Sequence, residues 1–399
     1  MRVLLMNQFF WPDAAATSQL LTDVARQLAA EGHEVHAICG ASGYSADQGE
    51  SRPDVTVHRV AGRKFSRSTV GRVLSYANFY VLAAWRALRV PRPDVVVTLT
   101  TPPLLSLLGN LVKSIRGARH VIWEMDMYPD VAVDLNYFRR GGVFDRVVGF
   151  LADTSRTYAD MIIALGECMR DRLQARGVPA EKIEVVHNWA DSRSIPVLSK
   201  TEHTDRFVVL YSGNLGLAHD LDTMMQAMRA LRDDLRFRFL FVGSGGRRQE
   251  LARFAEAHDL NAVELRPYVQ RSELARELAS GDIGLVLQSD VCCGSIVPSK
   301  VYGLLAAGRP ILFVGPAAAT PARLIRQFGC GWHISCGDVA SLTETLQRLA
   351  SSPEEVQEAS RRARAALVQH FDLPLGTAHI TALLRTTCLA PTAEACTTV

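Results

Sequence analysis

The sequence has no strong excess of charge of either sign, since 44 Lys and Arg residues are balanced by 41 Asp and Glu residues. A formal net charge of +3 is too small to indicate a nucleic-acid partner, so any basic function must come from local clustering. The eight cysteines form no CxxC pair, and the N-terminus opens on a strand pattern with no signal peptide, which favours a reducing cytoplasm. With 399 residues, 48% of them hydrophobic, the chain has the length and composition of a two-domain globular protein.

Glycine is absent from the connection after the first expected strand, where a dinucleotide-binding domain would carry GxGxxG. This absence, in residues 7–18, disfavours a nicotinamide or flavin site. The small residues Ala15, Ala16 and Thr17 are candidates for close approach of a ligand to the backbone, unless the aromatic side chains of the loop simply pack. Elsewhere in the first half, short apolar runs alternate with amphipathic helix patterns, which predicts a doubly wound α/β fold.

A polar stretch, residues 191–206, interrupts this alternation and predicts a linker between a first domain, 1–190, and a second, 207–370. The second domain repeats the α/β pattern. Its first two strands end in the glycine-rich sequences YSGNLG and VGSGGR, each ahead of a helix. Because the carboxyl ends of parallel strands meet at one edge of a sheet, we expect both loops to line one crevice.

The sequence GSIVPSKVYGLLAAGRP, residues 294–310, predicts a loop, a short helix over 299–307 with Pro298 at its start, and then a buried strand. Backbone N–H groups at a helix N-terminus favour anions, and Lys300 adds a positive charge in the first turn. The expected ligand is a phosphate or a diphosphate. Plain packing of a helix on a strand would give the same pattern, so the motif alone leaves both explanations open.

Residues 59–92 hold eight basic residues and no acid, with aromatic residues among them. Such a segment favours docking on an anionic bilayer surface, although a core helix beneath the sheet is an equal alternative. The helix expected at 70–88 is too short and too interrupted by polar residues to span a membrane, and no RNA-binding signature accompanies it. Arg139 and Arg140 extend the predicted face. The residues assigned to the membrane face are Arg63, Lys64, Arg67, Arg72 and Trp85.

Four acids follow a strand in the stretch WEMDMYPDVAVD, residues 123–134. Acids at the carboxyl end of a strand lie where open α/β sheets bind ligands. We expect Asp130 and Asp134 to act as helix-start acids, and we select Asp126 as the functional carboxylate, with Glu124 beside it. Although Glu124, Met125 and Asp126 resemble a DxD metal site, we assign no metal.

The second half of the chain resembles retaining family 4 glycosyltransferases of the GT-B fold, through the ordered motifs YSGNLG, HDLDT, FVGSGGRRQEL, RPYVQRSEL, GDIGLVL and VPSKVYGLLAAGRPIL. The first half resembles the subgroup that assembles bacterial O-antigen, capsule and exopolysaccharide repeat units, through FWPDAAATSQLLTDVARQLAAEGHEVHAI and WEMDMYP. The resemblance implies two facing Rossmann-like domains with an interdomain cleft. The first domain would hold the acceptor and the second the nucleotide sugar, while a helix in residues 371–399 would cross back to the first domain.

The resemblance also implies roles for individual residues. Lys300, His219 and Asp126 are the candidate catalytic residues, and His219 stands where many members carry Lys. Two departures are clear: Ser295 and Gly303 occupy the positions of a usual Glu pair, and Met125 replaces a usual His. The implied donor-binding residues are Gly213, Asn214, Leu215, Arg247, Tyr268, Val269, Ser295, Ile296, Val297, Lys300 and Gly303.

The implied reaction is transfer of a hexosyl-type sugar from a nucleoside diphosphate to a lipid-linked saccharide, without metal or cofactor. UDP is the favoured nucleotide, and an N-acetylated amino sugar is one option for the sugar. The enzyme is expected on the inner face of the cell membrane as a peripheral protein. Two alternatives stay open: a GT-B sugar-nucleotide epimerase, and a degenerate GT-B subunit that only binds a partner transferase, which the missing Glu pair would favour.

Overall fold

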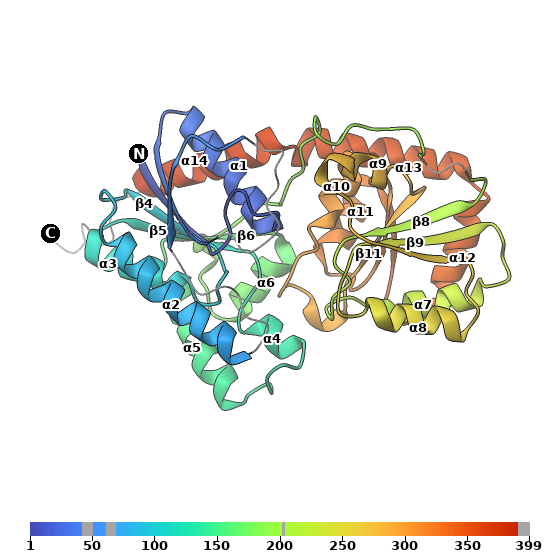
Figure 1. The fold of residues 1–399 in the computed structure, drawn as a ribbon, viewed down its shortest axis with the longest axis horizontal. Coiled ribbons are helices and arrows are strands. Elements are labelled where there is room, and N and C mark those ends of the chain that lie inside the picture. Colours follow the sequence, from blue (N-terminus) through green and yellow to red (C-terminus); the bar gives the residue numbers. More distant parts are fainter. Residues whose placement is uncertain (42–50, 61–68, 202–203, 390–399) are drawn as a thin grey trace. The chain divides into compact units, whose positions relative to one another are not determined.

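The computed structural model describes residues 1–41, 51–60, 69–201 and 204–389, with the backbone alone for 69–74. The chain divides into two compact units (Figure 1). Unit 1 comprises Met1–His187 and Pro374–Val399, and unit 2 comprises Asn188–Leu373. Each unit contains one fully parallel sheet covered by helices, which confirms the α/β class predicted from the alternating sequence pattern.

Unit 1 is built on a seven-stranded sheet in the order β3-β2-β1-β4-β5-β6-β7. The strands are short apolar runs because a parallel sheet is buried by helices on both faces. The direction of winding reverses between β1 and β4, and open α/β sheets bind ligands beyond such a reversal. The strands are β1 Arg2–Met6, β2 Glu34–Gly40, β3 Thr56–Val60, β4 Val95–Thr98, β5 Arg119–Glu124, β6 Met161–Ala164 and β7 Ile183–Val185. The helices are α1 Ala16–Ala30, α2 Thr69–Ala87, α3 Ser106–Arg116, α4 Asp130–Asp134, α5 Val143–Tyr158, α6 Glu167–Ala175 and α14 Leu373–Leu389.

Unit 2 is built on a six-stranded sheet in the order β10-β9-β8-β11-β12-β13, so its winding reverses between β8 and β11. The strands are β8 Phe207–Ser212, β9 Phe237–Val242, β10 Val263–Arg266, β11 Ile283–Leu287, β12 Ile311–Val314 and β13 Gly331–Ile334. The helices are α7 Leu221–Ala230, α8 Arg248–Ala257, α9 Leu274–Leu278, α10 Lys300–Ala306, α11 Thr320–Phe328, α12 Val339–Ala350 and α13 Pro353–Ala366.

Alternate residues of β8 enter two different cores of unit 2. Val208 and Leu210 pack with α10, α11 and α13 on one face of the sheet, whereas Val209 and Tyr211 pack with α7 and α12 on the other. Successive side chains of a strand point to opposite faces, so a strand covered on both faces must be apolar throughout. Burial of both cores fixes the carboxyl end of β8, where the first glycine-rich loop begins.

The structure corrects the start of one predicted helix. α10 begins at Lys300, not at Ser299, and it is seven residues long. Pro298 therefore lies in the preceding loop, outside the first turn. A helix this short has a weak dipole. The evidence for an anion site therefore depends on the Lys300 side chain and not on the helix terminus.

The last described helix, α14, belongs to unit 1 by its contacts. Arg385 forms an ion pair with Glu31 at the end of α1, and the Thr387 hydroxyl lies 3.6 Å from the sulfur of Met161 on β6. The inner residues Ile380 and Leu384 are fully buried. The C-terminal segment thus completes the packing of unit 1.

No helix in the part of the chain that the structure describes is long and apolar enough to cross a bilayer. Helix α2 matches the helix predicted at 70–88, and it buries Phe79 and Ala83 while Trp85 is exposed. Arg63, Lys64 and Arg67 of the predicted membrane face lie outside the described residues, and so does the side chain of Arg72.

Candidate functional site

Two glycine-rich loops of unit 2 touch through their backbones at the carboxyl ends of β8 and β9. The Gly213 N–H donates to the Val242 carbonyl at 2.9 Å, and the Leu215 N–H donates to the Ser244 carbonyl at 2.7 Å. A Cβ at Gly243 would overlap the carbonyl of Gly213. Gly213 and Gly243 also have φ values of 137° and 131°, which side chains rarely allow. Glycine is therefore required here by space and by conformation.

The side chain of Lys300 lies against the first of these loops. Its Nζ atom is buried and lies 3.7 Å from the centre of the Tyr211 ring, and a Cβ at Gly213 would lie 3.4 Å from it. Among the described residues, none offers this Nζ a hydrogen bond. Burial lowers the pKa of Lys300 to about 7 because the ammonium has lost water without gaining an anion. An unpaired, buried and titratable cation marks a candidate anion site.

His219 packs beside the same loop in its neutral form. Burial, and then the charge of Lys300, lower its pKa to about 4. Its Nδ1 atom lies 2.9 Å from the Gly216 nitrogen. If Nδ1 accepts from that N–H, the ring proton is on Nε2, which can donate to a ligand. The structure thus gathers Gly213, Lys300 and His219 around one loop. Their role in donor binding stays a prediction.

Tyr211 and Gln288 belong to this region, although sequence reasoning did not select them. The Tyr211 hydroxyl donates to the Asn214 carbonyl at 2.8 Å and so fixes the loop beneath Lys300. The Gln288 amide donates to the carbonyls of Cys292 and Ile296 at 3.0 and 3.2 Å. Tyr211 lies in the apolar strand β8, so its sequence context is that of a core residue. Its position two residues before Gly213 is the signal that could have identified it.

The remaining predicted donor residues lie in three kinds of surroundings. The Arg247 guanidinium is bound by Asp222 at 3.0 Å and by Glu250 at 2.6 Å, so its charge is already compensated. Tyr268 and Val269 are exposed, and Tyr268 lies near Gly243. Gly303 is half-buried, and among the described residues a Cβ there would meet only Leu278, at 3.8 Å. Asn214 and Leu215 belong to the loop after β8, against which Lys300 lies. Ser295, Ile296 and Val297 belong to the loop before α10, and Ser295 is fully buried.

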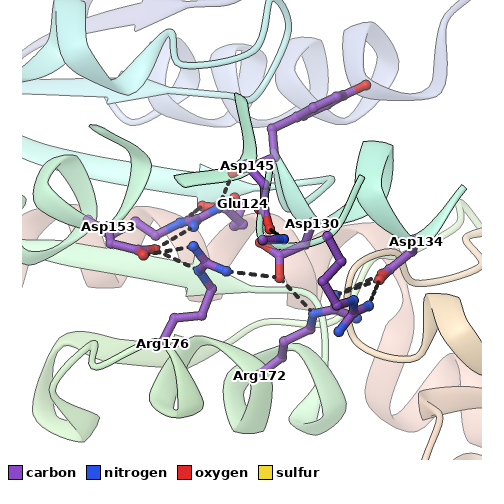
Figure 2. A network of polar contacts seen from close by, with 11 residues as sticks. Glu124, Asp130, Asp134, Asp145, Asp153, Arg172 and Arg176 are labelled. Carbon is purple, nitrogen blue, oxygen red and sulfur yellow. Dashed lines mark hydrogen bonds and ion pairs between the residues drawn. The ribbon is translucent and has the colours of Figure 1, made fainter. Parts of the chain in front are cut away.

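Unit 1 carries an ionic network that starts at Glu124, the last residue of β5 (Figure 2). Glu124 accepts from Arg156 at 2.6 and 3.3 Å, and both side chains are about 3% exposed. Arg156 also donates to the Tyr128 carbonyl at 3.0 Å. Glu124 is thus engaged as a structural counter-ion. The network continues through Asp153, Arg176, Asp130, Arg172 and Asp134.

The network also corrects one prediction about the acids of this stretch. Asp130 is the first residue of α4, as expected for a helix-start acid, but Asp134 is its last residue. Asp134 binds Arg172 at 2.8 Å and Arg140 at 2.9 Å. The helix is only five residues long, so the ion pairs and not the helix dipole explain this acid.

Asp126 lies two residues after the end of β5 and is held by its backbone. Its N–H donates to the Thr100 hydroxyl at 3.2 Å. Burial, and then the neighbouring charge of Glu124, raise the pKa of Asp126 to about 6. The Thr100 residue that accepts this hydrogen bond from the N–H of Asp126 also lines a small cavity, together with Leu104, Ser106, Glu124, Tyr128 and Arg156, among others. A carboxylate that titrates near neutral pH suits proton transfer or hydroxyl binding.

The other predicted residues of unit 1 lie at the start of α1. The helix begins at Ala16, with Ala15 in the N-cap position and Thr17 in the first turn, and no side chain caps this end. Ala16 is exposed. In the described ranges, no group of three His, Cys, Asp or Glu side chains is placed to hold a metal ion.

Comparisons with known proteins agree with this architecture. The family described as "Glycosyl transferase 4-like domain" matches residues 17–189, and the family described as "Glycosyl transferases group 1" matches residues 198–366. HepE from Anabaena, in complex with UDP and glucose, superimposes with a TM-score of 0.74 at 14% identity, covering 97% of this chain and 100% of that one. Two parallel Rossmann-like sheets with this similarity define the GT-B fold.

The chain belongs to the group 1, or family 4, glycosyltransferases. It is similar to the probable glycosyltransferase WbjE of Pseudomonas aeruginosa, with 25% identity over 304 residues, 72% of this chain and 74% of that protein. It is also similar to the putative colanic acid biosynthesis glycosyl transferase WcaI of Escherichia coli, with 26% identity over 357 residues, 82% of this chain and 86% of that protein.

Proposed function

We propose that this glycosyltransferase moves a hexosyl-type sugar from a UDP-sugar to a lipid-linked saccharide, with retention of the anomeric configuration, in the synthesis of a bacterial surface polysaccharide. One observation carries the donor side of the proposal: the buried Lys300 Nζ without a hydrogen-bond partner in the described structure, beside the backbone of Gly213. A buried cation is costly unless an anion pairs with it. The diphosphate of a nucleotide sugar would provide that anion.

In the proposed reaction, the acceptor hydroxyl oxygen forms a bond to the anomeric carbon while the bond from that carbon to the diphosphate breaks. The hydroxyl proton passes to the leaving phosphate oxygen on the same face. Negative charge grows on the diphosphate, where Lys300 and the N–H groups of the glycine loop stabilise it. Removing one preorganised donor of this kind costs about 10²-fold or more in rate.

On the acceptor side, we propose that Asp126 orients the attacking hydroxyl. Its pKa of about 6 means that it is ionised at neutral pH, where the carboxylate can accept a hydrogen bond from that hydroxyl. Glu124 is less suited to this role because Arg156 already binds both of its carboxylate oxygens. We also propose that the enzyme associates peripherally with the inner membrane surface, where a lipid-linked acceptor would be embedded.

The proposal is tested by incubating the protein with a panel of UDP-sugars, with and without a polyprenyl-diphosphate sugar acceptor, and with EDTA in a parallel series. A transferase releases UDP only when acceptor is present and yields a product with retained configuration. Alteration of the donor alone would identify an epimerase instead. Binding of UDP without either reaction would identify a subunit that supports a partner, and loss of turnover in EDTA would refute metal independence.

A further inference from the structure

Three helices of unit 1, labelled α2, α3 and α5 in Figure 1, carry exposed apolar side chains. On α3, exposed Leu107, Leu111 and Ile115 recur every four residues. On α5, Val143, Val147 and Phe150 form a second exposed row, and these three are 81%, 53% and 70% exposed. The third row, on α2, consists of Val81 and Trp85. The outer face of a surface helix is normally polar, so these rows require an explanation.

The three helices contact one another through α3, and we call their exposed apolar side chains together the apolar face. The Ser114 hydroxyl of α3 lies 3.1 Å from the Tyr158 hydroxyl of α5, and both residues are exposed, so the seam between these helices is at the surface. On the other side of α3, Tyr80 of α2 donates to the carbonyl of Pro103 just before α3 begins. Large contiguous apolar patches on a soluble protein mark sites of interaction.

Basic residues predominate around the apolar face. Helices α2 and α3 contain no acidic residue. Of the two acids of α5, Asp153 is paired with Arg176 at 2.8 Å, and Asp145 accepts from the Gly141 N–H at 2.7 Å. Arg146 is exposed, and Arg89 lies 3.8 Å from the centre of the Trp85 ring.

This charge pattern identifies the occupant. A second copy of the chain would bring like charges together, whereas the surface of an anionic bilayer would be attracted to them. Tryptophan and tyrosine at the edge of an apolar surface are also suited to the boundary between lipid head groups and hydrocarbon.

We propose that the apolar face, centred on Leu111, Val147 and Phe150, inserts into the hydrocarbon boundary of an anionic membrane. This proposal rests on the proposed function, since it supplies the route by which a lipid-linked acceptor arrives. Helices α3 and α5 also line the cavity near Asp126, through Ser106 and Arg156. Insertion of these helices therefore brings the cavity close to the membrane surface. Binding by insertion resists salt, whereas binding by surface charge alone does not.

The test is flotation of the purified full-length protein with phosphatidylglycerol and phosphatidylethanolamine vesicles at low and high NaCl. The unmodified protein should keep a salt-resistant fraction of bound material. The triple variant Leu111→Ser, Val147→Ser, Phe150→Ser should lose that fraction, with at least a tenfold weaker affinity at high salt. A matched control is Leu235→Ser, Val368→Ser, Leu375→Ser, which removes three exposed apolar side chains outside the apolar face and should bind vesicles like the unmodified protein.

Activity on a water-soluble acceptor with a short lipid chain separates this proposal from the proposed function. The triple variant should retain that activity, because none of its three positions is in the donor or acceptor site. Failure of all variants to transfer sugar would contradict the proposed function, yet flotation would still test the apolar face. Salt-resistant binding by the triple variant would overturn insertion, and so would complete release of the unmodified protein at high salt. A dimer in light scattering that the triple variant abolishes, without vesicle binding, would overturn it as well.

Discussion

At the scale of single residues, the proposed donor site predicts a pH effect at Lys300. Its Nζ is buried beside Gly213 with a pKa of about 7, so the free protein loses this proton as pH rises through 7. A bound diphosphate favours the charged form and raises the pKa. Binding of the UDP-sugar should therefore take up a proton. Above pH 7, its affinity should weaken by up to about tenfold per pH unit. This decrease should end where pH passes the pKa of Lys300 in the complex.

Calorimetry with a UDP-sugar between pH 6.5 and 8.5, in buffers of different ionisation enthalpy, measures this proton uptake directly. Lys300→Ala should bind about 10²-fold more weakly and without proton uptake. Lys300→Arg keeps a permanent charge, so its affinity should vary little over this pH range. Unchanged affinity in Lys300→Ala would remove Lys300 from the donor site.

Asp126 gives a second prediction at this scale. Its pKa is raised to about 6, by burial first and by Glu124 second, so it is ionised above that pH and protonated below it. If the Asp126 carboxylate accepts a hydrogen bond from the hydroxyl of the sugar acceptor, turnover should fall as pH decreases through 6. Asp126→Asn should reduce turnover by about 10²-fold and abolish this acidic limb. A loss below tenfold, with donor binding and melting temperature unchanged, would leave Asp126 as a structural acid.

At the scale of elements, the ion pair of Glu124 and Arg156 joins β5 to α5. Both side chains are nearly inaccessible to solvent, so Arg156→Ala would leave the Glu124 charge buried without its counter-ion. We expect a loss of about 3–5 kcal/mol in the free energy of unfolding, measured with denaturant. The double variant Glu124→Gln, Arg156→Met should recover part of this loss, because no unpaired charge is left.

Arg140 provides the control for this prediction. It also pairs with a buried acid, Asp134, but its side chain is 74% exposed, and Asp134 keeps Arg172 as a partner. Arg140→Ala should therefore change the free energy of unfolding by less than about 1 kcal/mol. Equal losses for Arg140→Ala and Arg156→Ala would show that burial does not set the strength of these pairs.

The elements differ in how far the sequence predicts them. Strands such as Val95–Thr98 are evident because burial on both faces requires continuous apolar runs. The glycines after β8 and β9 are also evident, since the close approach of Gly213 and Gly243 allows no side chain. The Glu124–Arg156 pair is not evident, because its partners are 32 positions apart and each resembles an ordinary surface charge. The start predicted for α10 was too early because it was inferred from Pro298. Proline is as compatible with a loop as with the first turn of a helix, so it does not locate the start.

At the scale of the whole molecule, sequence order alone predicted two α/β units, and the structure has a doubly wound parallel sheet in each. The motif order also indicated family 4, which the family matches confirm. The apolar face was not predicted, because Leu111 and Phe150 are 39 residues apart and each resembles an ordinary helix residue in sequence. Only the fold brings α3 and α5 together and turns their apolar rows outward.

We expect the basic segment at residues 59–92, which includes α2 with Val81 and Trp85 of the apolar face, to add a charge-dependent part to membrane binding. Each Lys or Arg near an anionic surface contributes about 1 kcal/mol at low salt. Removing four cations, Arg63→Ser, Lys64→Ser, Arg67→Ser and Arg72→Ser, should thus weaken vesicle binding by about 10²-fold or more at low salt and change it little at high salt. Flotation with anionic and neutral vesicles over a range of NaCl concentrations measures both parts. Equal binding of the unmodified protein to anionic and neutral vesicles at every salt concentration would show that the segment has no electrostatic role.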